Sequence, residues 1–134
     1  MKILIVEDDA VIGMLACEVL AMHGHETQGP AYSAHQALEL ARADPADIAF
    51  VDINLAGNDE GIALARQLRD EYLIPCIFSS GQVAAARKNC DAALALLRKP
   101  YGLEELEQSV NFIQALIAGK SPPPPSAPVS LEIF

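Results

Sequence analysis

Basic residues are scarce in this sequence. The 134 residues include 9 Lys and Arg against 18 Asp and Glu, which gives a formal net charge of −9. Because contacts to nucleic-acid phosphates need basic patches, this charge argues against a nucleic-acid partner. A chain of this length suits one domain with a single hydrophobic core.

Cysteines and long apolar runs are also few. Cys17, Cys76 and Cys90 form no CxxC pair, and Cys76 lies within an apolar run, so we expect reduced thiols and no disulfide framework. The opening MKILIVEDD has only four consecutive apolar residues before its acids, too few for a signal peptide. No run of 18 apolar residues occurs anywhere. We therefore expect a cytoplasmic, soluble protein without a membrane partner.

Short apolar runs alternate with amphipathic stretches along the chain. Four runs are continuously apolar, as is typical of parallel strands covered on both faces: residues 2–6, 47–53, 74–79 and 93–97. A weaker strand candidate covers residues 25–33. Five strand–helix units predict an α/β fold, in which a parallel sheet with right-handed crossovers carries helices on both faces.

Helical patterns fill the intervals between these strands. The first has Ile12, Leu15 and Val19 on one apolar side and ends near residues 23–25. The second begins after Ser33, a suitable N-cap. The second helix is expected at residues 33–43, and the third to fifth are expected at residues 60–72, 83–90 and 102–119.

Unusual polar residues fall at the carboxyl ends of the expected strands. Glu7 and Asp8 end the first, Asp52 the third, Ser80 the fourth, and Lys99 follows the fifth. Because the carboxyl ends of parallel strands share one edge of the sheet, we expect these side chains to converge. Clustered carboxylates favour a hard divalent cation with oxygen ligands, and Mg²⁺ fits. Asp52 can then act as a nucleophile toward a phosphoryl group, giving an aspartyl phosphate.

Each of these residues also has an ordinary structural interpretation. Strand-terminal acids often cap the next helix, which we expect of Asp9 and which remains an alternative for Asp8. Taken singly, Lys99–Pro100 is a loop dipeptide, and Ser80 before a glycine is a common turn. The argument for a site therefore depends on their joint placement.

Four sequence motifs, in order, resemble the receiver domain of bacterial two-component response regulators. They are ILIVEDD (3–9), DIAFVDINLAG (47–57), IPCIFSSG (74–81) and LLRKPY (96–101), and the resemblance spans about residues 2–118. It implies a flavodoxin-like (βα)5 fold, a doubly wound parallel five-stranded sheet in the order 2-1-3-4-5.

The resemblance also implies a role for each site residue. Mg²⁺ would be held by the acid pair, the acceptor and one backbone carbonyl: Glu7, Asp8, Asp52 and Asn54. Asp52 would accept a phosphoryl group from a histidine kinase or a histidine phosphotransfer protein. The phosphoryl oxygens would be bound by Ser80 and by Lys99, which precedes a proline that is usually cis.

Two departures from the family pattern concern signal transmission. In the family, the loop after the acceptor usually contains Pro–Gly and a glycine eight residues after the acceptor. Here the loop NLAGNDEG (54–61) has Ala56 before Gly57 and places Gly61 one residue later, so we expect a different loop shape. Leu96 stands three residues before Lys99, where the family commonly has Tyr or Phe. A rotating aromatic switch at this position is therefore excluded.

The composition changes after the last helix, in GKSPPPPSAPVSLEIF (119–134). We therefore divide the chain into a receiver domain, residues 1–118, and a Pro-rich C-terminal tail, residues 119–134. Four consecutive prolines favour a stiff extended spacer. The end VSLEIF either is disordered or, since its apolar residues alternate, pairs as a strand on its own domain or on a second copy in a homodimer. The expected place is beside the fourth and fifth helical units, where the family makes output contacts.

The tail is too short for an output domain, which predicts a single-domain response regulator. We expect a phosphorylation-controlled switch that contacts an unknown downstream protein and is not an enzyme beyond its own phosphorylation and dephosphorylation. One alternative is a Mg²⁺-dependent phosphohydrolase, which is disfavoured because Asn54 occupies the expected place of the general acid. A second alternative is a scaffold that is never phosphorylated.

Overall fold

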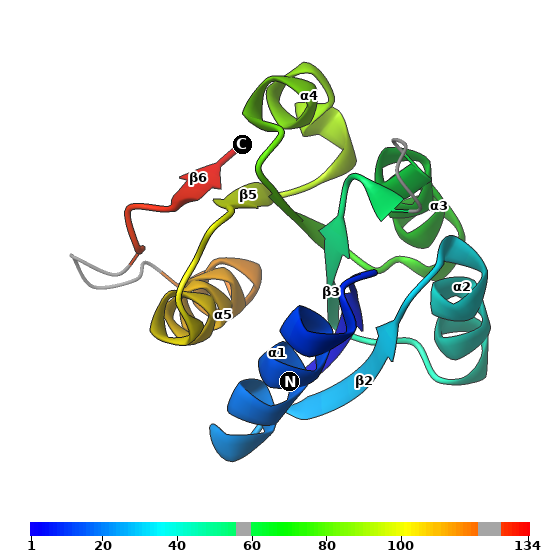
Figure 1. The fold of residues 1–134 in the computed structure, drawn as a ribbon, viewed down its shortest axis with the longest axis horizontal. Helices are drawn as coiled ribbons and strands as arrows, with labels where there is room; N and C mark the ends of the chain where they lie inside the picture. Colours follow the sequence, from blue (N-terminus) through cyan, green and yellow to red (C-terminus); the bar gives the residue numbers. More distant parts are fainter. Residues whose placement is uncertain (56–59, 121–126) are drawn as a thin grey trace.

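The fold is built on one six-stranded sheet in the order β2-β1-β3-β4-β5-β6 (Figure 1). The computed structural model describes residues 1–55, 60–120 and 127–134. Strands β1 to β5 pair in parallel, and β6 pairs antiparallel to β5. The strands are Lys2–Val6, Glu26–Ala31, Ile48–Asp52, Cys76–Ser80, Ala95–Arg98 and Leu131–Ile133. The predicted parallel order 2-1-3-4-5 is confirmed, with β6 as an addition.

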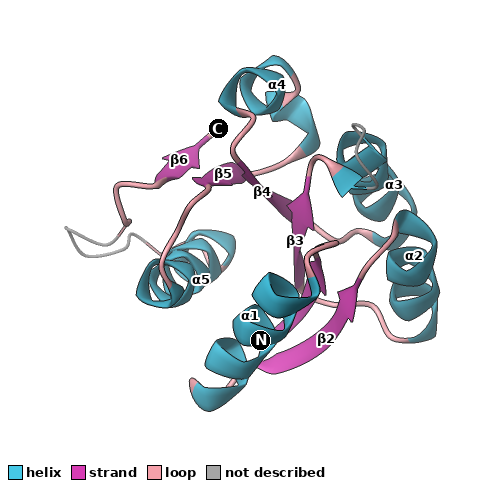
Figure 2. Cartoon of the chain, in the orientation of Figure 1, coloured by secondary structure: helices cyan, strands magenta, loops and turns pink. Residues whose placement is uncertain are grey.

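Helices cover both faces of the sheet (Figure 2). They are α1 to α5, with a short 3₁₀ turn before β5: Ala10–Met22, Ala34–Ala43, Glu60–Tyr72, Val83–Lys88, Leu103–Ile117 and the turn Cys90–Ala92. In β1, Ile3 and Ile5 pack with α1 and α5, whereas Leu4 and Val6 pack on the opposite face. The unbroken apolar run of β1 is thus explained by a strand covered on both sides.

Two helices begin where the sequence predicts capping residues. The Asp9 carboxylate accepts hydrogen bonds from the backbone N–H groups of Val11 and Ile12, at 3.0 and 3.1 Å. The Ser33 hydroxyl accepts from Gln36 N–H at 3.2 Å. Each side chain satisfies N–H groups that have no partner within the first helical turn.

The buried face of α1 differs from the prediction. Ile12 and Leu15 are 37% and 42% exposed, and the helix instead buries its smaller neighbours and one leucine: Gly13, Ala16 and Leu20. The reason is steric, since a Cβ atom at position 13 would lie 2.7 Å from Cβ of Pro30. The apolar side predicted for this helix was therefore wrong, although Val19 packs at the margin of the core.

The C-terminal segment joins the sheet. β6 confirms the prediction of a strand on the chain's own domain, and it lies between α4 and α5 at the outer edge of β5 (Figure 1). The division at residue 118 stays a prediction. The altered shape expected for the 54–61 loop concerns mainly residues 56–59, which lie outside the described residues.

None of the helices in the described ranges has the length and apolar character required to cross a membrane.

Candidate metal and phosphoryl-transfer site

Three carboxylates meet at the carboxyl ends of β1 and β3. One oxygen each from Glu7, Asp8 and Asp52 lies within 4.8 Å of the other two. Glu7 and Asp52 are buried, at 3% and 6% exposure, whereas Asp8 is exposed to solvent. The convergence predicted from the strand ends is therefore present in the structure.

Lys99 places its ammonium between the two buried acids. Its Nζ donates to Glu7 Oε1 at 2.5 Å and lies 3.6 Å from Asp52 Oδ2. The Lys99–Pro100 peptide bond is cis, as the resemblance implies. Burial by itself lowers the pKa of Lys99, but the hydrogen bond to Glu7 and the charges of Glu7 and Asp52 outweigh burial and raise that pKa. Lys99 therefore stays cationic.

The pKa of Glu7 is raised within this cluster. Burial raises the pKa of its carboxyl to about 7, and the neighbouring Asp52 adds to this rise, while the hydrogen bond from Lys99 opposes it. Its second oxygen accepts from Asp9 N–H at 3.3 Å. One ammonium therefore compensates the buried acids only in part.

Ser80 and Asn54 lie beside this cluster. Ser80 is buried at the end of β4, next to the strand that carries Asp52, and its hydroxyl accepts from Gln82 N–H at 2.9 Å. Asn54 N–H donates to Asp52 Oδ1 at 3.1 Å. The structure thus brings both residues to the correct edge, with the hydroxyl of Ser80 engaged in its own loop.

Gly61 allows α3 to begin directly against the end of β3. A Cβ atom at this position would lie 2.0 Å from the carbonyl oxygen of Asp52 and 2.6 Å from Cα of Ile53, while Gly61 N–H donates to Ile53 O at 2.9 Å. The sequence did not reveal this close approach. Gly61 therefore packs directly against the backbone of the acceptor residue.

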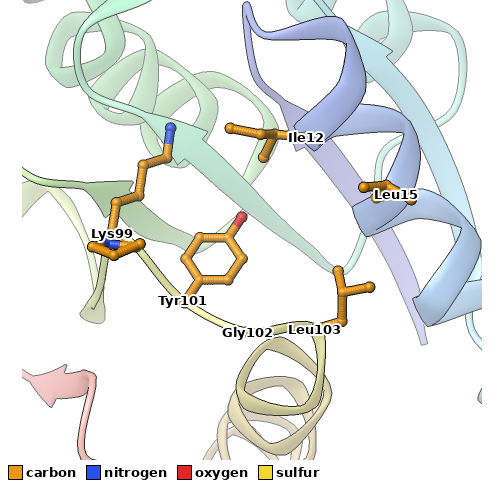
Figure 3. A pocket seen from close by; sticks show the side chains of 7 residues that line it. Ile12, Leu15, Lys99, Tyr101, Gly102 and Leu103 are labelled. Atoms are coloured by element: carbon orange, nitrogen blue, oxygen red, sulfur yellow. The ribbon is translucent and has the colours of Figure 1, made fainter.

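An apolar groove adjoins Lys99 (Figure 3). Its volume is about 480 Å³, and it is lined by α1, by the connection between β5 and α5 and by the first residue of α5: Ile12, Leu15, Lys99, Pro100, Tyr101, Gly102 and Leu103. Burial, together with the charges of Glu7 and Asp52, raises the pKa of Tyr101 to about 12, so its hydroxyl is neutral. Sequence reasoning missed Tyr101 and this groove, although the surplus of apolar residues in α1 was a signal.

The charges of the cluster suit a divalent cation. Counted with every carboxylate ionised, the three acids and one ammonium carry a formal charge of −2, and Lys99 is the cation that the described residues pair with these acids. An exposed Asp8 beside two buried acids leaves one side open to water, which Mg²⁺ keeps in its coordination shell. The residues therefore fit Mg²⁺.

Comparison with known proteins decides the family. The sequence model of the response regulator receiver domain matches residues 3–111. The chain belongs to this family. It is a receiver domain of a two-component system, and such domains typically bind Mg²⁺ at an acidic pocket and are generally not enzymes beyond their own phosphorylation chemistry.

Relatives agree with this assignment. The transcriptional regulatory protein PdtaR of Mycobacterium tuberculosis is 29% identical over 115 residues, which cover 83% of this chain and 55% of PdtaR. The chain thus spans about half the length of this curated relative.

Solved structures also match the receiver domain. The receiver domain of NtrX from Brucella abortus has a TM-score of 0.74 and 28% identity, covering 86% of this chain and 98% of that one. A putative response regulator from Chloroflexus aurantiacus has a TM-score of 0.75 and 29% identity, covering 85% and 97%. A CheY-like receiver domain from Methanospirillum hungatei, at 22% identity, has a TM-score of 0.79 over 88% of this chain and supports the fold alone.

Proposed function

We propose that Asp52 accepts a phosphoryl group from a phosphohistidine of a kinase or phosphotransfer protein, and that the phosphorylated domain signals by protein contact. One observation carries the proposal: a buried carboxylate, Asp52, has an ammonium 3.6 Å away and two further acids within 4.8 Å. A nucleophile, a phosphate-neutralising cation and a set of metal ligands are thereby combined at one edge of the sheet.

The transfer is a single displacement at phosphorus. A carboxylate oxygen of Asp52 forms the new P–O bond while the P–N bond of the phosphohistidine breaks, and the imidazole leaves and takes up a proton. Lys99 exchanges its bond to Glu7 for one to the phosphoryl oxygens, and Ser80 donates its hydroxyl hydrogen to another oxygen. Water later attacks the same phosphorus and releases inorganic phosphate, which resets the domain.

The metal would be held by oxygen ligands from Glu7, Asp8, Asp52 and the backbone carbonyl of Asn54. When bound, Mg²⁺ neutralises charge on the phosphoryl oxygens during transfer. Asp8 is exposed and makes no described bond to Lys99, so it is available as a direct ligand. Glu7 is already held by Lys99 and Asp9, and we assign it a supporting role through water.

The groove beside Lys99 supports a protein as the phosphodonor. Ile12 and Leu15 of α1 and Leu103 of α5 expose 37 to 42% of their surface around it (Figure 3). An apolar surface next to a charged site is typical of a place where another protein docks. A small phosphodonor needs the carboxylate and Lys99, whereas a protein donor also gains from this surface.

The test is intact-mass measurement after treatment with acetyl phosphate and Mg²⁺. The wild-type chain should gain one phosphoryl group, and Asp52→Ala should gain none. Asp47→Asn is the matched control, because Asp47 is an exposed acid that precedes the opposite end of the same strand.

Three outcomes would contradict the proposal. An equal mass gain in Asp52→Ala would place the phosphate elsewhere. Absence of any gain, with acetyl phosphate and then with a phosphorylated histidine phosphotransfer protein, would favour a scaffold. Steady turnover of a small phosphomonoester would favour a phosphohydrolase.

A further inference from the structure

The edge of the sheet at β5 is covered by the chain's own C-terminal segment. β6 pairs antiparallel with β5, so that Ile133, Glu132 and Leu131 lie opposite Ala95, Leu96 and Leu97 in turn. An uncovered edge strand offers unpaired N–H and C=O groups and accepts another strand readily. In Figure 1, β6 occupies this edge beside α4 and α5.

Apolar side chains from the segment anchor it on both sides of the sheet. Leu131 is 7% exposed and joins the core formed with α1 and α5. Phe134 packs against the opposite core, which includes Leu96, and its N–H donates to Leu94 O at 2.9 Å. The segment is thus held by two apolar sockets, which are the places where Leu131 packs on one face of the sheet and Phe134 on the other.

Charge complements these sockets. Glu132 accepts from Arg87 of α4 at 2.7 and 2.9 Å, and its Oε1 lies 3.6 Å from Arg98 Nη1. The hydrogen bond from Arg87 lowers the pKa of Glu132. Arg98 also binds the main chain of the segment, since its backbone N–H donates to Ser130 O at 2.9 Å. Arg87 and Arg98 thus favour an acidic residue between the two apolar anchors, as Glu132 lies between Leu131 and Phe134.

The hold of β6 on this edge is limited. The strand has three residues, its neighbour Val129 is 92% exposed and Ile133 is 42% exposed. Both arginine contacts lie near the surface, where ion pairs contribute little because water competes. Displacing the segment requires breaking this short strand pairing and its surface ion pairs, together with the bonds of Arg98 to Val129 and Ser130 and the bond of Ser130 to Glu105.

We propose that the edge of β5, with Arg87 and Arg98, is a binding site for an extended peptide that has an apolar residue, then an acid, and a second apolar residue two positions after the acid, and that β6 occupies it in cis as a built-in competitor. A partner gains main-chain hydrogen bonds from the edge and specificity from the arginine pair and the two sockets. Its apparent affinity is reduced by the fraction of molecules in which β6 is bound. This site goes beyond phosphoryl transfer and does not depend on Asp52.

The test measures binding of a fluorescent peptide, APVSLEIF, to the full chain by anisotropy. Glu132→Arg should bind it at least about tenfold more tightly than wild type, because the chain's own strand now meets two arginines with a positive charge. A peptide with Lys in place of its Glu should lose this binding. Glu71→Arg is the matched control, since it changes the same charge at an exposed site on α3.

A second measurement distinguishes release of β6 from unfolding of the whole domain. The Arg98 amide donates to the carbonyl oxygen of Ser130, directly before β6, so its hydrogen exchange should quicken in Glu132→Arg while the β1 and β3 amides stay protected. The double variant Arg87→Glu with Glu132→Arg restores an opposite pair between α4 and the chain's own segment, so exchange of the Arg98 amide should slow again toward that of wild type.

Equal peptide affinity in wild type and Glu132→Arg would show that β6 does not compete, and absence of binding in every variant would show that the edge accepts no peptide. Either result overturns the proposal. Because the assay needs no phosphodonor, such a failure leaves phosphorylation of Asp52 untouched.

Discussion

Gly61→Ala is a substitution for which two physical effects predict opposite signs. Alanine is favoured over glycine in a helix by about 1 kcal/mol, so helix propensity alone predicts a more stable protein. The new Cβ atom, however, would lie 2.0 Å from Asp52 O and 2.6 Å from Cα of Ile53, well inside the 3.4 Å at which ordinary contact begins. The three nearest atoms all belong to the backbone of Asp52 and Ile53, so no flexible side chain can move away to relieve the contact.

The steric effect should win. Overpacking of a buried site costs typically about 1–3 kcal/mol, and occasionally more when backbone must shift. We place the steric cost of Gly61→Ala at the upper end, about 3 kcal/mol, which leaves a net loss of about 2 kcal/mol after the gain in helix propensity. A typical domain has a free energy of unfolding of about 5–15 kcal/mol, so this loss is a substantial share. Relief requires moving the end of β3, so Asp52 should also take up phosphate more slowly.

Urea unfolding and the rate of phosphoryl uptake measure the two effects separately. Gly81→Ala is the control, because a Cβ atom there meets nothing within 4 Å and the residue follows another site residue, Ser80. This variant should stay within about 0.5 kcal/mol of wild type or be slightly more stable. If Gly61→Ala matched or exceeded wild type in both stability and uptake, the close approach would not constrain the site.

Three further predictions concern the metal, the switch and the thiols. Mg²⁺ affinity should fall at least about tenfold, or about 1.4 kcal/mol, in Asp8→Ala and less in Glu7→Gln, by magnesium titration; equal losses would contradict direct ligation by Asp8. A phosphate mimic at Asp52 should shift NMR signals as far as α4, which is six residues long and buries one alanine; shifts confined to the site would contradict this. Because burial raises the pKa of Cys76 to about 12, a thiol reagent near neutral pH should modify exposed Cys90 and leave Cys76 unmodified until the protein unfolds, as read by peptide mapping.

The parallel sheet could be predicted because its strands carry a strong local signal. A strand buried on both faces must be apolar at every position, as in Ile48 to Val51, and helices long enough to cross the sheet lie between such strands. Even the weak candidate around residues 25–33 proved to contain β2. Topology then placed the site, since the carboxyl ends of neighbouring parallel strands share one edge.

The sequence predicts which residues form the site better than it predicts how their side chains contact one another. Sequence order brings Glu7, Asp52 and Lys99 to one edge, but it does not reveal that Lys99 bonds Glu7 at 2.5 Å and approaches Asp52 only to 3.6 Å. Side-chain pairing depends on backbone position to within an ångström, and residue spacing carries no information at that scale. For the same reason, the sequence did not predict the close approach of Gly61 to the backbone of Asp52 and Ile53.

The face of α1 was misassigned for a reason that also explains the groove. Apolar residues occur on every side of this helix, so periodicity cannot tell which side meets the sheet. Close packing against Pro30 selects the side with Gly13 and Ala16, and the larger Ile12 and Leu15 are left outside. A helix that only needed to cover a sheet would carry polar residues there, because exposed apolar surface has a cost in solubility. Of the apolar residues that α1 leaves exposed, Ile12 and Leu15 lie along the groove beside Lys99, where an incoming phosphodonor protein would cover them.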